Sequence, residues 1–140
     1  MSYREKSAWA LLILLMSAGG FYAWEVGGAW LVGGVAPKPS IKLAVVYIGI
    51  VIIGVIISES SLAASHEDEY DLPADERERA AMNKAGNWSG YVLAFGVIAG
   101  VIHYYQHDDG RLMFHFVVGS LMVSQIVEYA LQIWFFRRGV

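Results

Sequence analysis

The sequence predicts an all-α integral membrane protein, a four-helix bundle with both termini in the cytoplasm. The 140-residue chain is 56% hydrophobic and only 16% charged, whereas soluble domains carry roughly 25% charged residues. Four long apolar stretches follow one another, and most charged residues lie between them or at the chain ends. Most Lys and Arg residues lie near those ends of the apolar stretches that would share one side of the membrane. Together these observations indicate a single transmembrane domain over residues 1–140.

Each apolar stretch approaches or reaches the length of a helix that crosses a hydrocarbon core, which takes about 20 residues. The expected spans cover about 8–31, 41–57, 88–105 and 112–136. Turn residues separate the spans of each pair: Pro37-Lys38-Pro39 in the first and Asp108-Asp109-Gly110 in the second. Segment 58–87 is expected to be a cytoplasmic loop and helix, with the helix beginning near Pro73 and continuing into the third span.

Basic residues set the expected orientation, because Lys and Arg favour the cytoplasmic ends of membrane spans. With four spans, the N-terminus, segment 58–87 and the C-terminus share one side. That side carries Arg4, Lys6, Arg77, Arg79, Lys84, Arg137 and Arg138, and the other carries only Lys38, Lys42 and Arg111. This distribution predicts a multi-pass protein of the cell's inner (cytoplasmic) membrane, with the lipid bilayer as its first partner.

Composition also excludes several functions. The chain has no cysteine, which excludes disulfides, Cys-ligated zinc, iron–sulfur clusters and thiol catalysis. No run of basic residues indicates nucleic-acid binding. His103 and His107 are four residues apart but lack the intervening Glu of a zinc-protease helix. We therefore expect no catalytic residues and no nucleic-acid partner.

Polar side chains at membrane depth are costly to bury, so each is a candidate for function. One group is expected near the outer boundary: Glu25, His103, His107 and His115, with Asp108 or Asp109. Its nitrogen and oxygen atoms suit zinc or another divalent metal. A haem between His103 and His115 is a second interpretation. The third, which the sequence favours, is that these histidines only face headgroups and water.

A second polar group is expected near the inner boundary. Gln125, Glu128 and Gln132 share one face of the fourth span. At similar height lie Ser58 and Glu59 on the second span, and Asn87 and Ser89 on the third. Lys84 or an interfacial Arg is expected to neutralise Glu128. The preferred interpretation is hydrogen bonding between helices, which fixes their packing. The alternative is a proton- or cation-binding carboxylate in a transporter or channel.

Small residues predict close helix contacts. The third span carries two pairs at four-residue spacing, Gly86/Gly90 and Gly96/Gly100, and the first span has six glycines, Gly19, Gly20, Gly27, Gly28, Gly33 and Gly34. Such spacing lets helix backbones approach each other in a membrane. Four short helices enclose little interior, so part of this surface is expected to serve a homodimer.

Four short motifs occupy the C-terminal half. They are Asp75-Glu76-Arg77, Gly90-Tyr91-Val92-Leu93, Glu128-Tyr129-Ala130-Leu131-Gln132 and Arg137-Arg138-Gly139. This pattern resembles a family of small bacterial four-span inner-membrane proteins of unknown function, with an Asp-Glu-Arg motif before the third span and an Arg-Arg-Gly tail. The resemblance implies a joint role for Asp75, Glu76, Arg77 and Glu128. It implies no activity.

These observations favour a structural, regulatory or interaction role. It would act through the cytoplasmic motif Asp75, Glu76, Arg77 and Arg79, in which Asp75 and Arg79 are spaced for an i,i+4 ion pair, and it would involve a cytoplasmic protein partner. The alternatives are a small transporter or channel that uses Glu128 and the outer histidines, and a protein that binds a metal or haem.

Overall fold

The computed structural model describes residues 2–65 and 73–138, and in these ranges every regular element is a helix. The helices are α1 (Tyr3–Gly33), α2 (Ile41–Ser65), α4 (Glu76–His107) and α5 (Gly110–Arg138). All four are long and apolar enough to cross a membrane. The predicted all-helical class and the four apolar helices are therefore confirmed.

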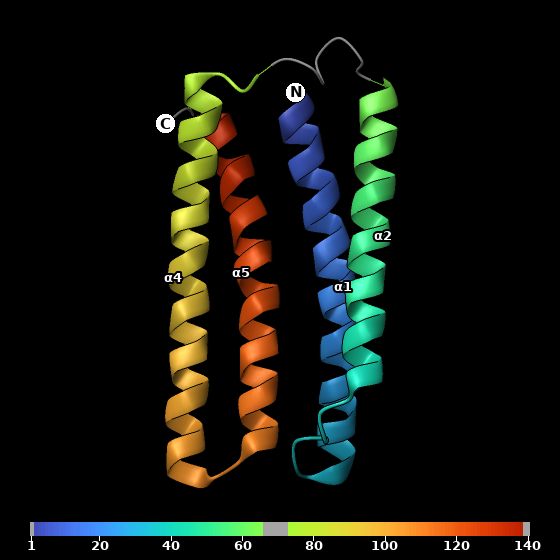
Figure 1. Cartoon of the computed structure of the whole chain (residues 1–140), viewed down its shortest axis with the longest axis vertical. Helices are drawn as coiled ribbons and strands as arrows, with labels where there is room; N and C mark the ends of the chain where they lie inside the picture. The colour runs from blue at the N-terminus through green and yellow to red at the C-terminus, as the bar shows by residue number, and fades with distance from the viewer. Residues whose placement is uncertain (1, 66–72, 139–140) are drawn as a thin grey trace.

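The helices form two hairpins, α1–α2 and α4–α5, whose axes run side by side (Figure 1). Both chain termini lie at one end of the molecule, hereafter the terminal end. The connections 34–40 and 108–109 lie at the other, hereafter the hairpin end (Figure 1).

Capping side chains and left-handed residues fix the hairpin end. At the end of α1, Gly34 has a φ of 69°, and its N–H donates to the carbonyl of Trp30 at 2.8 Å. Glycine adopts this conformation without the steric cost of a Cβ. Asp108 closes α4 in the same way with a φ of 52°, and Asp109 Oδ1 accepts from the first amides of α5. Both predicted turns are confirmed.

Packing between the helices is unequal. The α4–α5 pair is the most extensive, followed by α1–α5 and α1–α2, so the neighbours are ordered α4, α5, α1, α2. Helix α2 contains no buried residue, although it is the most hydrophobic of the four. An apolar surface that the protein itself leaves uncovered is suited to lipid.

The third-span glycines account for the close α4–α5 contact. A Cβ at Gly100 would lie 2.9 Å from the Cβ of Phe116, and one at Gly96 would lie 2.7 Å from the Cβ of Ser120. Gly90, in contrast, meets nothing within 4 Å. The predicted 96/100 contact is thus confirmed. On α1, a Cβ at Gly20, Gly27, Gly28 or Gly33 would also meet no atom within 4 Å, and the homodimer stays a prediction.

At the terminal end the helices are longer than the predicted spans. Residues 58–65 continue α2, and 76–87 form the first three turns of α4. Helix α4 begins three residues after Pro73, because the Asp75 carboxylate supplies its N-cap. Residues 66–72 of the predicted 58–87 segment, and Gly139 of the tail motif, lie outside the described residues.

Candidate functional site

Three helix ends meet at the terminal end: the N-termini of α1 and α4 and the C-terminus of α5. Two ion pairs join them. Arg4 Nε lies 3.1 Å from Glu78 Oε2, which links α1 to α4. Arg137 Nε lies 2.8 Å from Glu5 Oε1, which links α5 to α1. Helix α1 is therefore tied by ion pairs to both helices of the other hairpin.

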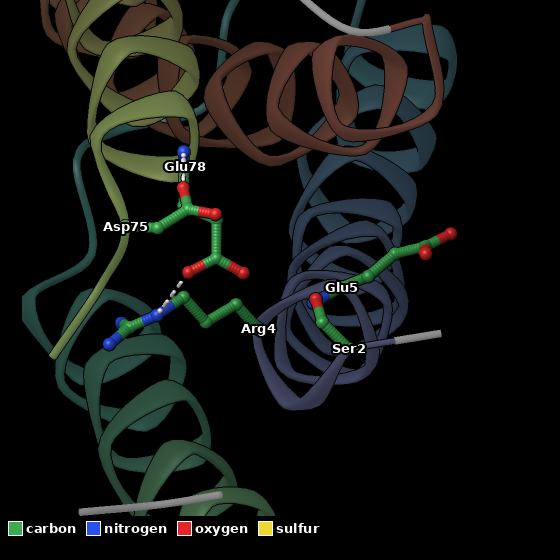
Figure 2. A network of polar contacts seen from close by, with 5 residues as sticks. All are labelled: Ser2, Arg4, Glu5, Asp75 and Glu78. Carbon is green, nitrogen blue, oxygen red and sulfur yellow. Dashed lines mark hydrogen bonds and ion pairs between the residues drawn. The ribbon is translucent and has the colours of Figure 1, made fainter. Parts of the chain in front are cut away.

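Acidic and hydroxyl groups cap the two N-termini at this junction (Figure 2). The Asp75 carboxylate accepts from the backbone N–H of Glu78 at 2.7 Å, and Ser2 Oγ accepts from that of Glu5 at 3.3 Å. Figure 2 shows the Arg4 guanidinium beside Glu78, close to this cap. Asp75 thus caps its own helix, where it satisfies an amide that has no partner within the helix. Its i,i+4 pairing with Arg79 stays a prediction.

The first turns of α4 pack on the end of α5 through a small core. Ala81 and Ala85 are 1% and 0% exposed, and they contact Phe135, with Leu131 and Phe136 around them. The Lys84 ammonium lies 4.9 Å from the centre of the Phe135 ring, a cation–π contact. This core holds the polar start of α4 against the end of α5.

The opposite face of this segment is open. The exposed residues of 76–87 are Glu76, Arg77, Arg79, Ala80, Asn83, Lys84 and Asn87. Since Glu78 is paired with Arg4 and Asp75 is occupied as the cap, the three basic groups outnumber the remaining acid. The motif predicted from the sequence is thus divided into a cap, Asp75, and an exposed, mostly basic face.

Polar side chains also join α4 to α5 farther along these helices. The Ser89 hydroxyl of α4 lies 2.9 Å from the Gly86 carbonyl oxygen and 3.2 Å from Glu128 Oε2 on α5, so the two acceptors share its one proton. Gln132 Nε2 donates to the other oxygen of Glu128 at 3.4 Å. Ser89 and Gln132 are buried. The sequence analysis placed Ser89 at a height similar to that of Glu128, and the two side chains are in contact. Gln125 is exposed and lies outside this network.

A second carboxylate lies on α2. Glu59 accepts from the Tyr3 hydroxyl at 2.9 Å and from the Ser7 hydroxyl, both on α1. The two carboxylates and their hydroxyl and amide donors form two separate clusters, one between α1 and α2 and one between α4 and α5, which we together call the carboxylate layer.

Two features of this layer differ from the sequence prediction. Lys84 was expected to neutralise Glu128, but its ammonium lies over the Phe135 ring. The roles of Tyr3 and Ser7 were missed. These two residues are four positions apart and so share a helix face, which is the signal that could have identified them.

The four outer residues are divided between two places. The ring of His115 lies between α1 and the 34–40 connection: Nδ1 is 2.9 Å from the Tyr22 hydroxyl, and Nε2 is 3.0 Å from the Pro37 carbonyl oxygen. A carbonyl can only accept, so Nε2 carries the proton and Nδ1 accepts from Tyr22. Glu25 lines a cavity that His115 also reaches. His103 and His107 instead stack on each other, with ring centres 4.4 Å apart.

These positions bear on the metal and haem predictions. In the described parts of the chain, no three His, Cys, Asp or Glu side chains are grouped to hold a metal ion. His115 uses both ring nitrogens in hydrogen bonds, and His107 Nδ1 lies 3.2 Å from the His103 carbonyl. A zinc site would need some of these bonds to be exchanged for metal bonds. Metal and haem binding stay predictions.

No protein-family model, no characterised protein and no solved structure matches this chain. The resemblance of its C-terminal half to small bacterial four-span proteins therefore rests on the four short motifs alone.

Proposed function

We propose that this chain is a multi-pass protein of the bacterial inner membrane that binds a cytoplasmic protein through the exposed face of α4. Both termini then lie in the cytoplasm, as the seven basic residues of the terminal end favour. The bacterial assignment rests on the resemblance of the C-terminal half. The role is one of interaction, without catalysis.

The observation that carries this proposal is the core beneath the first turns of α4. Residues 76–87 are the polar part of a 32-residue helix, and at 1.5 Å per residue they reach about 18 Å beyond the predicted start of the apolar span. A simple connection between two spans would not need Ala81 and Ala85 to be fully buried against Phe135. A helix held rigidly to α5 loses little conformational entropy when a partner binds.

Charge defines the partner. The open face of residues 76–87 presents Arg77, Arg79 and Lys84 beside a single exposed carboxylate, that of Glu76. Basic groups on a fixed helix steer acidic surfaces toward it and select them over basic ones. The proposed partner is therefore a protein with an acidic contact surface.

Site-specific photocrosslinking in intact cells tests this proposal. A crosslinker at Asn83, on the exposed face, should give a discrete protein adduct that is lost in Arg77→Glu/Arg79→Glu. A crosslinker at Tyr105, exposed at the hairpin end, serves as the control and should not give that adduct. The Arg111→Glu variant controls for a loss of basic charge elsewhere. An adduct that persists after the double charge reversal, in a chain that still inserts, would exclude this face as the docking site.

The carboxylate layer favours a second candidate function, the binding and transfer of a proton or small cation. Glu59 and Glu128 receive hydrogen bonds from hydroxyl and amide donors. Ionisable groups at membrane depth often mark ion or proton pathways. Flux in liposomes should then fall in Glu128→Gln and in Glu59→Gln but not in the control Glu76→Gln. Absence of flux with the unmodified protein would remove this candidate.

A further inference from the structure

A cavity of about 410 Å³ lies at the hairpin end, between α1, α2 and the connection that joins them. Part of its wall is apolar and comes from Phe21, Leu43 and Val46. Three charged residues, Glu25, Lys38 and Lys42, also line it. The cavity therefore has the two-part chemistry of an amphiphile, with one region for a charged group and one for hydrocarbon.

The path of the chain brings these charges together. Figure 1 shows that the connection after α1 turns back along that helix, so that α2 begins before the level at which α1 ends. Lys38 and Lys42 are thereby brought to the same cavity as Glu25, which lies within α1. Pro37 and Pro39 restrict the backbone of this connection, and the His115 ring holds the Pro37 carbonyl from α5. The cavity is thus formed before any ligand arrives.

The charged groups of the cavity are not paired with one another. In the described part of the chain, ion pairs join Arg4 to Glu78 and Arg137 to Glu5, and none joins Glu25 to either lysine. Two lysines and one glutamate therefore line a single cavity without an ion pair between them. A ligand that carries both a phosphate and an ammonium group complements this set, since each of its charges meets a charge of opposite sign.

We propose that this cavity binds the headgroup of a membrane phospholipid that carries a primary amine, such as an ethanolamine phospholipid. The phosphate lies at Lys38 and Lys42, and the ammonium group donates to Glu25. The first methylenes of the acyl chains cover Phe21, Leu43 and Val46. A lipid is favoured over a soluble zwitterion because the apolar wall continues from the charged rim along two helices that are apolar enough to span a membrane.

Native mass spectrometry of the detergent-purified chain, titrated with defined lipids, tests the proposal. Ethanolamine phospholipid should be retained about threefold more than choline phospholipid, which has the phosphate but no N–H donor, the preference expected from one partly exposed ion pair. Glu25→Gln should abolish the preference for the amine. Lys38→Ala/Lys42→Ala should weaken retention of both lipids. Arg111→Ala, which removes a cation at the same end but outside the cavity, is the matched control and should change neither.

Three results would overturn the proposal. One is equal retention of the ethanolamine and choline lipids by the unmodified chain. Another is a loss of retention in Arg111→Ala as large as that in the lysine variant, which would indicate general attraction by charge. The third is displacement of the lipid by soluble glycerophosphoethanolamine at comparable concentration, which would make the free headgroup the ligand. Circular dichroism of each variant shows whether it remains folded, and Glu25→Gln preserves side-chain volume, so its lipid preference can be interpreted directly.

Discussion

The carboxylate of Glu128 on α5 accepts a hydrogen bond from the Ser89 hydroxyl on α4, 3.2 Å away, and this bond joins the two most extensively packed helices of the molecule. Gln132, one turn along α5, donates to the other oxygen of the same carboxylate. A polar group that is buried among apolar helices stabilises the arrangement in which its partners are met and disfavours shifted ones.

The Ser89→Ala variant should therefore be less stable by about 0.6–1.5 kcal/mol, the range of one interhelical hydrogen bond in a membrane protein. Reversible unfolding in mixed micelles measures the free energy of unfolding. Gln125→Ala is the control, because Gln125 is exposed on the same helix as Glu128 and outside the network. Equal stability of Ser89→Ala and the unmodified chain would mean that the bond contributes nothing to packing.

Two glycines of α4 should respond in opposite ways to an added methyl group. In Gly96→Ala the new Cβ would lie 2.7 Å from the Cβ of Ser120, so the helices must separate at a cost of about 1–3 kcal/mol. Gly90→Ala meets nothing within 4 Å and should be neutral or stabilising, because alanine favours a helix over glycine by about 1 kcal/mol. Thermal unfolding of both variants measures the difference.

The double variant Gly96→Ala/Ser120→Gly tests the cause of the Gly96 effect. It moves the methyl-sized group from α5 to α4 and should recover much of the stability lost in Gly96→Ala. If the double variant is less stable than Gly96→Ala alone, close approach to Ser120 is not the reason for the loss.

Hydrophobic length was sufficient to predict the four helices, because a single segment can satisfy all its own backbone hydrogen bonds in lipid only as a helix. The similar position of Glu128 and Ser89 along the length of their helices could be predicted as well, since each helical residue advances the chain by a constant 1.5 Å. Which levels of a helix face are covered by a neighbouring helix could not be predicted. Gln125 and Gln132 share a face of α5, yet only Gln132 is buried, because burial depends on which neighbour covers that level of the helix.

The limits were greatest where side chains of two different helices meet. Glu59 is bound by Tyr3 and Ser7, and nothing in the local sequence of α2 indicates that α1 supplies these donors. The histidines show the same limit. Their common depth was apparent, but His115 faces α1 while His103 packs against His107 and Phe116. Spacing along one helix does not define the direction of a ring on another.

Removing the N-cap of α4 should loosen its first turn. Asp75→Ala loses the acceptor for the Glu78 amide, at a cost of about 1 kcal/mol. Asp75→Asn keeps an acceptor oxygen at this position and should retain most of the stability. Hydrogen exchange of residues 76–80 should increase in the alanine variant and stay near the unmodified rate in the asparagine variant. An equal increase in exchange in both variants would indicate that the charge of the carboxylate stabilises this helix end and that the capping hydrogen bond does not.

The ion pair between Glu5 and Arg137 should contribute little to stability. The Arg137 side chain is 57% exposed, whereas that of Glu5 is 12% exposed, so water screens one partner. A double-mutant cycle with Glu5→Gln and Arg137→Gln should give a coupling of less than about 1 kcal/mol that falls as salt is added. A larger coupling that does not depend on salt would show that the terminal end is more deeply shielded than its exposure indicates.

Among the hydrogen bonds of the described residues, the Tyr22 hydroxyl is the only donor from α1 to the His115 ring. Its removal therefore measures how much this one bond contributes to the contact between the two hairpins at the hairpin end. Tyr22→Phe should cost about 1 kcal/mol, because Nδ1 of His115 is left without its hydrogen bond. Tyr47→Phe is the matched control: its ring meets that of Tyr22 edge to face, with centres 6.2 Å apart, and Phe keeps this contact. Since His115 also holds the Pro37 carbonyl, Tyr22→Phe should also increase hydrogen exchange in residues 34–40, whereas Tyr47→Phe should not. Unchanged exchange in both variants would mean that the prolines alone keep this connection in place.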